Sequence, residues 1–191
     1  MYKICKTESA AQRQRMLELC LLKEMAEQPF SQITISGLCR YAGVPRKAFY
    51  RYFKNLDDAL LALVDHTMEA CNREIMNAWD GSSQLTQRTL EAYFSYWVDN
   101  KNFVDIMIRQ DLWHLVIMSA TAYVDRRKAE NHSQVKSADY ANELAEYFVS
   151  HGLMMTIMHW CYHGCPSTPK EMAKAFCEML NMPLASRSRL F

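Results

Sequence analysis

Glycine and proline are scarce in this chain, and that scarcity constrains its fold more than any other feature. The 191 residues include only five Gly and five Pro, the two residue types that most often interrupt helices and strands. Between them, apolar residues recur every three to four positions more often than they alternate. This spacing is typical of helices with one buried face. The sequence therefore predicts an all-α protein with about nine helices.

Capping residues delimit the first helices. Thr7, Thr34 and Asn55 carry side-chain oxygens that can accept a hydrogen bond from the first turn of a following helix. Gly43 suits the left-handed conformation that ends many helices, and Pro45 suits the first turn of the next one because its φ is fixed. We therefore expect helices over 7–27, 34–41, 46–52 and 55–78, and then over roughly 84–99, 102–109, 111–128, 137–163 and 169–180.

The small net charge of +1 hides an uneven distribution of charge along the chain. Residues 1–55 hold ten Lys or Arg against four Glu, whereas residues 56–191 hold twelve basic against seventeen acidic residues. A basic end on a slightly acidic body indicates that the first part contacts a polyanion, most simply nucleic acid.

Cysteine use and hydropathy indicate the compartment. The seven cysteines are an odd number scattered through helical patterns, and the first residues do not resemble a secretory signal. The longest apolar stretch, 112–124, is too short for a bilayer and contains His114. We therefore expect reduced thiols, a cytoplasmic location and no association with membranes.

Residues 33–55 combine two short helices, a tight turn containing Gly43, and a second helix rich in basic and aromatic residues. This pattern predicts a helix-turn-helix whose second helix enters the DNA major groove. Long basic side chains can reach base edges or phosphates, and hydroxyl groups can donate to phosphate oxygens. We expect Phe49 and Phe53 to anchor the unit by facing inward. The candidate DNA contacts are Thr34, Arg46, Lys47, Tyr50, Arg51 and Tyr52. The alternative is an amphipathic surface helix with a solvated basic side.

Residues 31–64 resemble the DNA-binding signature of the TetR family of bacterial transcriptional regulators. The stretch LCRYAGVPRKAFYRYFKNLDDALL is similar to the family pattern of Ile-Ala, two residues, Ala-Gly-Val-Ser, an aromatic run ending in Phe, a polar cap and KEELL. The preceding RQRMLELCLLKEM resembles the first helix of the family. The sequence departs from the pattern at Gly37, Pro45 and Leu56, where the family commonly has an acidic residue, Ser and a phosphate-contacting Lys. Lys54 can replace that Lys and is a further candidate contact.

The resemblance implies a helix-turn-helix domain over 1–55 and a helical effector-binding and dimerisation domain over 56–191. It implies a homodimer formed through the last two long helices, with recognition helices in successive major grooves of a pseudo-palindromic operator, about 34 to 36 Å apart. It also implies a repressor that an apolar or aromatic small molecule releases from DNA, with no cofactor.

Methionine and aromatic residues are abundant in the second domain, and such residues can line an adaptable apolar pocket. The resemblance places a pocket between the helix over 55–78 and the helices that follow it. Ordinary core packing explains the same pattern and stays open as an alternative. The candidate effector contacts are Tyr93, Trp97, Met107, Trp113, Met155 and Met158.

The segment HWCYHGC places His159 and His163 one helical turn apart, with Cys161 and Cys165 at the same spacing. Each pair shares a face and could bind a borderline-soft metal or act in redox chemistry. The two pairs point roughly 160 to 200 degrees apart on a helix, so all four converge only if the helix ends near Gly164. His159 and His163 are therefore weak metal candidates, and a role at a dimer interface or on the surface is the alternative.

Two other classes of function compete with a DNA-binding regulator. An enzyme is not expected, because the sequence has no phosphate-binding Gly loop, nucleophile elbow or metalloprotease motif. A helical protein-interaction or ligand-binding module without specific DNA binding is the other rival. It does not explain why the basic excess coincides with the helix-turn-helix.

Overall fold

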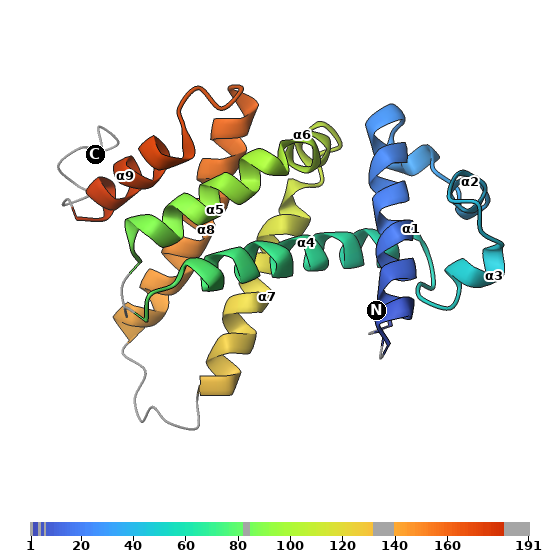
Figure 1. Cartoon of the computed structure of the whole chain (residues 1–191), viewed down its shortest axis with the longest axis horizontal. Coiled ribbons are helices and arrows are strands. Elements are labelled where there is room, and N and C mark those ends of the chain that lie inside the picture. Colours follow the sequence, from blue (N-terminus) through green and yellow to red (C-terminus); the bar gives the residue numbers. More distant parts are fainter. Residues whose placement is uncertain (1, 4, 6, 82–84, 132–139, 182–191) are drawn as a thin grey trace.

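The computed structural model describes residues 2, 3, 5, 7–81, 85–131 and 140–181. These residues form helices without strands, which confirms the predicted all-α fold (Figure 1). None of the helices described is both long and apolar enough to span a bilayer. Along the chain the elements are α1 (Glu8–Glu27), η1 (Phe30–Gln32), α2 (Ile35–Tyr41), α3 (Arg46–Phe49), α4 (Leu56–Ala78), α5 (Gln87–Asp99), α6 (Lys101–Arg109), α7 (Trp113–Asn131), α8 (Tyr140–Tyr162) and α9 (Pro169–Leu180).

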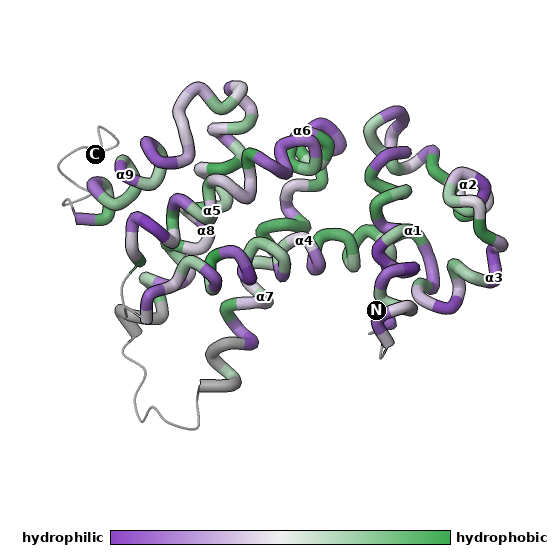
Figure 2. The backbone as a smooth tube through the Cα atoms, in the orientation of Figure 1, coloured by the Kyte–Doolittle hydropathy of each residue, from purple (hydrophilic) through white to green (hydrophobic). Residues whose placement is uncertain are grey.

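The helices form a small head and a larger body. Helices α1 to α3 make the head at one end of the molecule, and α5 to α9 make the body, while α4 runs from one to the other (Figure 1). Within the body, α5 packs between α4 and α9, and α7 packs against α8. Hydrophobic and hydrophilic residues alternate along most helices in Figure 2, as expected for helices that bury one side.

The predicted caps of the first helices are confirmed. Thr7 accepts a hydrogen bond from the Ala10 amide, and Asn55 accepts one from the Asp58 amide at 2.8 Å. The predicted extent of α3 was wrong, since this helix ends at Phe49 and not at residue 52. The Arg51 and Tyr52 amides then donate to carbonyls three residues earlier, as in a tightened last turn, and the chain turns towards α4.

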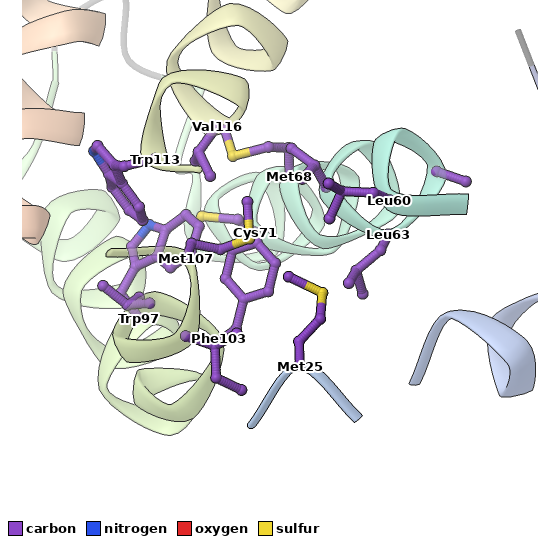
Figure 3. Close-up of a cluster of buried hydrophobic side chains, with 14 of the residues drawn as sticks. Met25, Leu60, Leu63, Met68, Cys71, Trp97, Phe103, Met107, Trp113 and Val116 are labelled. Carbon is purple, nitrogen blue, oxygen red and sulfur yellow. The ribbon is translucent and has the colours of Figure 1, made fainter. Parts of the chain in front are cut away.

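The hydrophobic core is continuous from the head into the body. Met25 of α1 lies beside Leu60 and Leu63 of α4, and the same cluster continues to Trp97 and Met107 (Figure 3). A division at residue 55 would fall at the N-cap of α4, a helix whose buried residues belong to this continuous core. The division into 1–55 and 56–191 therefore stays a prediction, based on charge and on the helix-turn-helix.

Gln110, at the end of α6, joins the body to the head by hydrogen bonds. Its side-chain Nε2 donates to the carbonyl oxygens of Met25 and Gln28 at 2.9 and 3.0 Å, and its Oε1 accepts from the Phe30 amide at 3.0 Å. The C-terminal carbonyls of a helix lack partners within the helix, so one side chain here pairs groups that α1 leaves open. The turn between α6 and α7 is thereby fixed to the end of α1.

Glu18 forms a polar contact between the head and α4, the helix that runs from the head into the body. Its side chain is fully buried and accepts hydrogen bonds from Arg15 Nη1 at 3.0 Å and from Nδ1 of His66, on α4, at 2.9 Å. The hydrogen bond to Glu18 raises the pKa of His66, although burial opposes the shift. A protonated His66 therefore neutralises a carboxylate that would be costly to bury alone.

We predict that His66→Gln removes a pH-dependent part of the stability. A raised pKa in the folded state means that protonation stabilises the fold fully below about pH 6.5, and that this stabilisation is lost as the pH rises through the folded-state pKa. The urea midpoint of the wild-type protein should therefore fall as the pH rises from about 6 to 8. In the variant this decrease should be smaller. His114→Gln, at an exposed histidine, is the control, and equal slopes in all three proteins would contradict the prediction.

Candidate nucleic-acid interface

The head contains the predicted helix-turn-helix, built from α2, a turn at Gly43, and α3. Gly43 has a φ of +66°, and its amide donates to the Arg40 carbonyl at 3.2 Å. The Val44 amide donates to the Cys39 carbonyl at 2.9 Å, which completes the glycine-dependent motif that ends many helices. Thr34 caps α2 by accepting from the Gly37 amide at 3.0 Å. The turn is therefore defined by backbone hydrogen bonds.

Two phenylalanines hold the short α3 against the rest of the head. Phe49 and Phe53 are buried, as predicted, with ring centroids 5.2 Å apart. Isolated helices shorter than about 12 residues are marginal in water, so a four-residue helix such as α3 depends on this anchoring. The burial of one side of α3 leaves its other side facing outward.

The outward side of α3 and of the turn that follows it carries the predicted basic and aromatic residues. Arg46, Lys47, Tyr50 and Arg51 are all exposed. Arg46 Nη2 donates to the Tyr50 hydroxyl at 3.2 Å, and the guanidinium carbon lies 5.9 Å from the centre of the Tyr50 ring. This contact orders two long side chains before any ligand binds. Arginine and tyrosine arranged in this way can contact bases and phosphates of duplex DNA.

The remaining predicted contacts differ in accessibility. Thr34 and Lys54 are exposed at the two edges of the helix-turn-helix. Tyr52 is only 8 % exposed, and its ring packs 6.1 Å from that of Phe53. The hydrophobic contact explains this burial, which the sequence did not indicate. A phosphate contact by Tyr52 stays a prediction and is restricted to the edge of its ring that reaches the surface.

Residues before α1 also lie beside the helix-turn-helix, which sequence reasoning did not identify. The Lys3 amide donates to the Tyr52 carbonyl at 3.0 Å, and the Tyr2 hydroxyl donates to Asp65 Oδ2 of α4 at 3.0 Å. Lys3 is exposed and adds a cation next to α3. The basic character of this segment was visible in the sequence, but helical periodicity could not reveal its position.

The structure brings together four of the six predicted effector contacts. Tyr93, Trp97, Met107 and Trp113 are buried, and the Trp97 ring lies 6.3 Å from that of Tyr93 and 6.2 Å from that of Trp113. Figure 3 shows Trp97, Met107 and Trp113 in one cluster.

The other two predicted effector contacts lie elsewhere on α8. Met155 is 44 % exposed on the outside of this helix, and Met158 is half-buried. Burial of the central four residues agrees with a core role, so the effector contacts stay a prediction.

This cluster contains several buried polar groups that lack a partner among the described residues, and the Trp160 indole elsewhere in the core lacks one as well. Within the described structure, the Tyr93 hydroxyl and the indole nitrogens of Trp97 and Trp113 are buried without a hydrogen-bond partner. Burial raises the pKa of Tyr93 well above its usual value, and the Trp97 indole beside the hydroxyl opposes the shift. Most buried donors in proteins are paired, and each exception calls for an explanation.

A separate hollow of about 750 Å³ lies between the end of α1 and the turn that joins α6 to α7. Gln110 and Arg109 contribute to its lining, as do Gln28 and Phe30 from the head. It does not include any of the six predicted effector contacts.

The histidine and cysteine cluster occupies the last turn of α8 and the residues after it. The rings of His159 and His163 are 4.5 Å apart, and the sulfur atoms of Cys161 and Cys165 are 3.7 Å apart. Among the described residues there is no group of three or more His, Cys, Asp or Glu side chains placed to hold a metal ion. The structure thus shows two separate pairs.

The fold and the exposed surface of α3 define a helix-turn-helix protein of the DNA-binding class. The chain belongs to the TetR family of bacterial regulatory proteins. Residues 22–63 match the model described as "Bacterial regulatory proteins, tetR family", and residues 85–182 match one described as "Transcriptional regulator C-terminal region". The resemblance noted in the sequence is thereby confirmed, and the second match extends it over the body.

Individual relatives are distant. An uncharacterized HTH-type transcriptional regulator of Haemophilus influenzae is 22 % identical over 138 residues, which are 71 % of this chain and 62 % of the relative. The chain thus spans less than two thirds of that relative's length.

Solved structures share the fold over nearly the whole chain. The fatty acid degradation regulator FadR from Bacillus halodurans superimposes with a TM-score of 0.63 at 16 % identity, covering 93 % of this chain and 96 % of that one. FadR from Bacillus subtilis, in complex with stearoyl-CoA, gives a TM-score of 0.59 at 17 % identity, covering 87 % and 96 %. At these identities the likeness shows the fold alone.

We predict that Arg46→Ala weakens binding to duplex DNA by about 1–3 kcal/mol, or roughly 5- to 150-fold, because it removes a cation from the outward side of α3. Fluorescence anisotropy with a labelled duplex at fixed salt measures the change. Arg88→Ala is the matched control, since Arg88 is equally exposed but lies at the start of α5 in the body. Equal affinities of the two variants would show that α3 does not contact the DNA.

Proposed function

We propose that this protein is a homodimeric transcriptional repressor that binds a pseudo-palindromic operator through α3 and is released by a small apolar effector. The observation that carries the proposal is the ordered Arg46 and Tyr50 pair on the outward side of a helix anchored by buried phenylalanines. A solvated surface helix would gain little from holding two long side chains in one geometry, because such ordering costs conformational entropy.

The dimer proposal rests on exposed apolar residues along α8. They are spaced four or seven positions apart and therefore share one face of the helix. The opposite face of α8 is buried in the body, so this helix has apolar residues on two sides. Monomeric proteins rarely expose a continuous apolar strip, and such strips mark interfaces. The exposed residues are Leu144, Phe148, Met155 and Tyr162 of α8, and Met179 of α9 is also exposed.

The effector proposal rests on the unpaired donors in the apolar cluster around Trp97. A ligand with an apolar chain and one acceptor group would pair with the Tyr93 hydroxyl or an indole N–H while replacing apolar contacts. The stearoyl-CoA seen with the similar FadR of Bacillus subtilis has this chemistry. We therefore propose a long-chain acyl compound as the effector class.

Release from DNA follows if the effector binds the two states of the protein unequally. Met107 and Gln110 both belong to the end of α6, where one side chain lies in the cluster and the other is bonded to α1. A ligand that displaces Met107 would therefore shift the anchor of the head. The spacing of the two recognition helices in a dimer would change with it.

Selection of random duplex DNA by the purified protein tests the proposed function. We expect enrichment of an inverted repeat, because two identical heads related by a two-fold axis read two identical half-sites. The same selection with Arg46→Ala should lose the enrichment, and the selection with Arg88→Ala should retain it. A folded dimer that enriches no sequence at any salt concentration would contradict the proposal.

The selected operator then allows the effector class to be tested. Titration of the complex with stearoyl-CoA should release the DNA, whereas free coenzyme A should not, because it lacks the acyl chain. Unchanged operator affinity across acyl chains of different length would contradict this effector class. It would leave the DNA-binding proposal intact.

We predict that Phe148→Glu dissociates the dimer, because it places a charge at the centre of the proposed apolar interface. The dimer dissociation constant should rise by about thirtyfold or more, the loss typical of a central interface residue. Sedimentation equilibrium measures it. Leu19→Glu is the control, since Leu19 is also exposed but lies on α1. A Phe148→Glu protein that remains as dimeric as the control would place the interface elsewhere.

A further inference from the structure

The end of α8 has a backbone geometry that determines the position of Cys165. Gly164 has a φ of +81°, and its amide donates to the Cys161 carbonyl at 2.9 Å. The Cys165 amide donates to the Trp160 carbonyl, also at 2.9 Å. These two bonds form the helix-ending motif in which the residue after the left-handed glycine folds back over the last turn.

This motif brings two thiols into contact. The sulfur atom of Cys165 lies 3.7 Å from that of Cys161. Cys161 is buried, whereas Cys165 is partly exposed to solvent. Cys165 also has a φ of +56°, a left-handed conformation that few side chains adopt without cost. The pairing thus depends on six consecutive residues and not on distant parts of the fold.

We propose that Cys161 and Cys165 form a reversible dithiol–disulfide site that exchanges with low-molecular-weight disulfides such as glutathione disulfide. The proposal goes beyond regulation by the effector and does not depend on it. Closing the bond requires the sulfur atoms to approach from 3.7 Å to about 2.05 Å. Cys165 lies three residues beyond Tyr162, where α8 ends, so its side chain can move without breaking hydrogen bonds within the helix.

The exchange takes place in two balanced steps. The Cys165 thiolate attacks one sulfur of glutathione disulfide, forms a mixed disulfide and releases one glutathione thiolate. Cys161 then loses its proton to solvent and attacks the Cys165 sulfur, which releases the second glutathione thiolate. Overall the two cysteines lose two protons and two electrons, and glutathione disulfide takes up two protons and two electrons to become two glutathione thiols.

The different surroundings of the two thiols determine that Cys165 attacks first and Cys161 second. Burial, and then the neighbouring Cys165, raise the pKa of Cys161 to about 12, so its thiolate is scarce near neutral pH. Cys165 is accessible to a dissolved disulfide, and Cys161 acts second, when its target is already in contact with it. A buried thiol of high pKa is a poor nucleophile towards solutes, but adjacency compensates in an intramolecular step.

A disulfide here would fix the junction between α8 and α9. Trp160, in the same turn, packs 5.6 Å from Phe94 of α5, and Phe94 packs 6.3 Å from Phe176 of α9. The site therefore lies beside the contacts that position α9. Oxidation at this junction would act on the helix pair to which we assign the dimer.

Peptide mass spectrometry after equilibration in glutathione buffers tests the proposal. The reduced protein, without DNA, is equilibrated at a series of ratios of reduced to oxidised glutathione, quenched with acid and alkylated under denaturing conditions. Residues 137–170 lie between successive Lys residues, so one tryptic peptide contains both cysteines and no other. The internal disulfide appears as the loss of two hydrogens and of both alkyl groups.

We expect this disulfide to form at ratios at which Cys20 and Cys177, two partly exposed cysteines elsewhere, are still alkylated, and to be reversed by dithiothreitol. Cys165→Ser should leave Cys161 alkylated throughout, and Cys161→Ser should accumulate the mixed disulfide of Cys165 with glutathione. Circular dichroism confirms that both variants are folded. Alkylation of both thiols at every ratio, or a disulfide that forms no earlier than the modification of Cys20 and Cys177, would overturn the proposal.

Discussion

The packing of α1 against α4 is the contact on which the rest of this structure depends. α3 is too short to be stable alone, and its position is set by phenylalanines buried against neighbouring helices. α4 packs against both the head and the body, so one continuous core fixes the helix-turn-helix relative to the body. Close-packed cores respond to local change by shifting whole elements, because side chains fill the available volume. The head therefore cannot move independently of α4.

Two polar contacts at the same boundary add directional constraints that apolar packing lacks. Apolar surfaces can slide with little loss, but hydrogen bonds weaken steeply with misalignment. Gln110 pairs three backbone groups at the end of α1, and Glu18 joins α1 to His66 near the middle of α4. Because these contacts lie at separate points along α1, they restrict both its rotation and its tilt.

Local interactions explain what the sequence could predict. The caps at Thr34 and Asn55, the left-handed Gly43 and the inward phenylalanines all follow from neighbours within a few positions. The sequence did not indicate the contacts of Gln110 with the end of α1 and with Phe30, which join positions 80 to 85 apart. Such pairs follow from the tertiary arrangement, and no periodicity encodes them. The sequence also could not separate effector contacts from core residues, because both show the same spacing of apolar residues along a helix.

The unpaired donors near Trp97 lie close to α6, the helix whose end is hydrogen-bonded to the head. Met107 is buried in the cluster, and Gln110 follows it by about one turn of α6. A ligand that satisfies a buried donor gains free energy only where that donor was unpaired, so it selects whichever arrangement of α6 admits it. Each arrangement of α6 either keeps or breaks the three hydrogen bonds of Gln110 to the head, so the ligand also selects between these two states. If the Gln110 side chain exchanges between a bonded and a released state, the head would switch between two positions and would not move gradually.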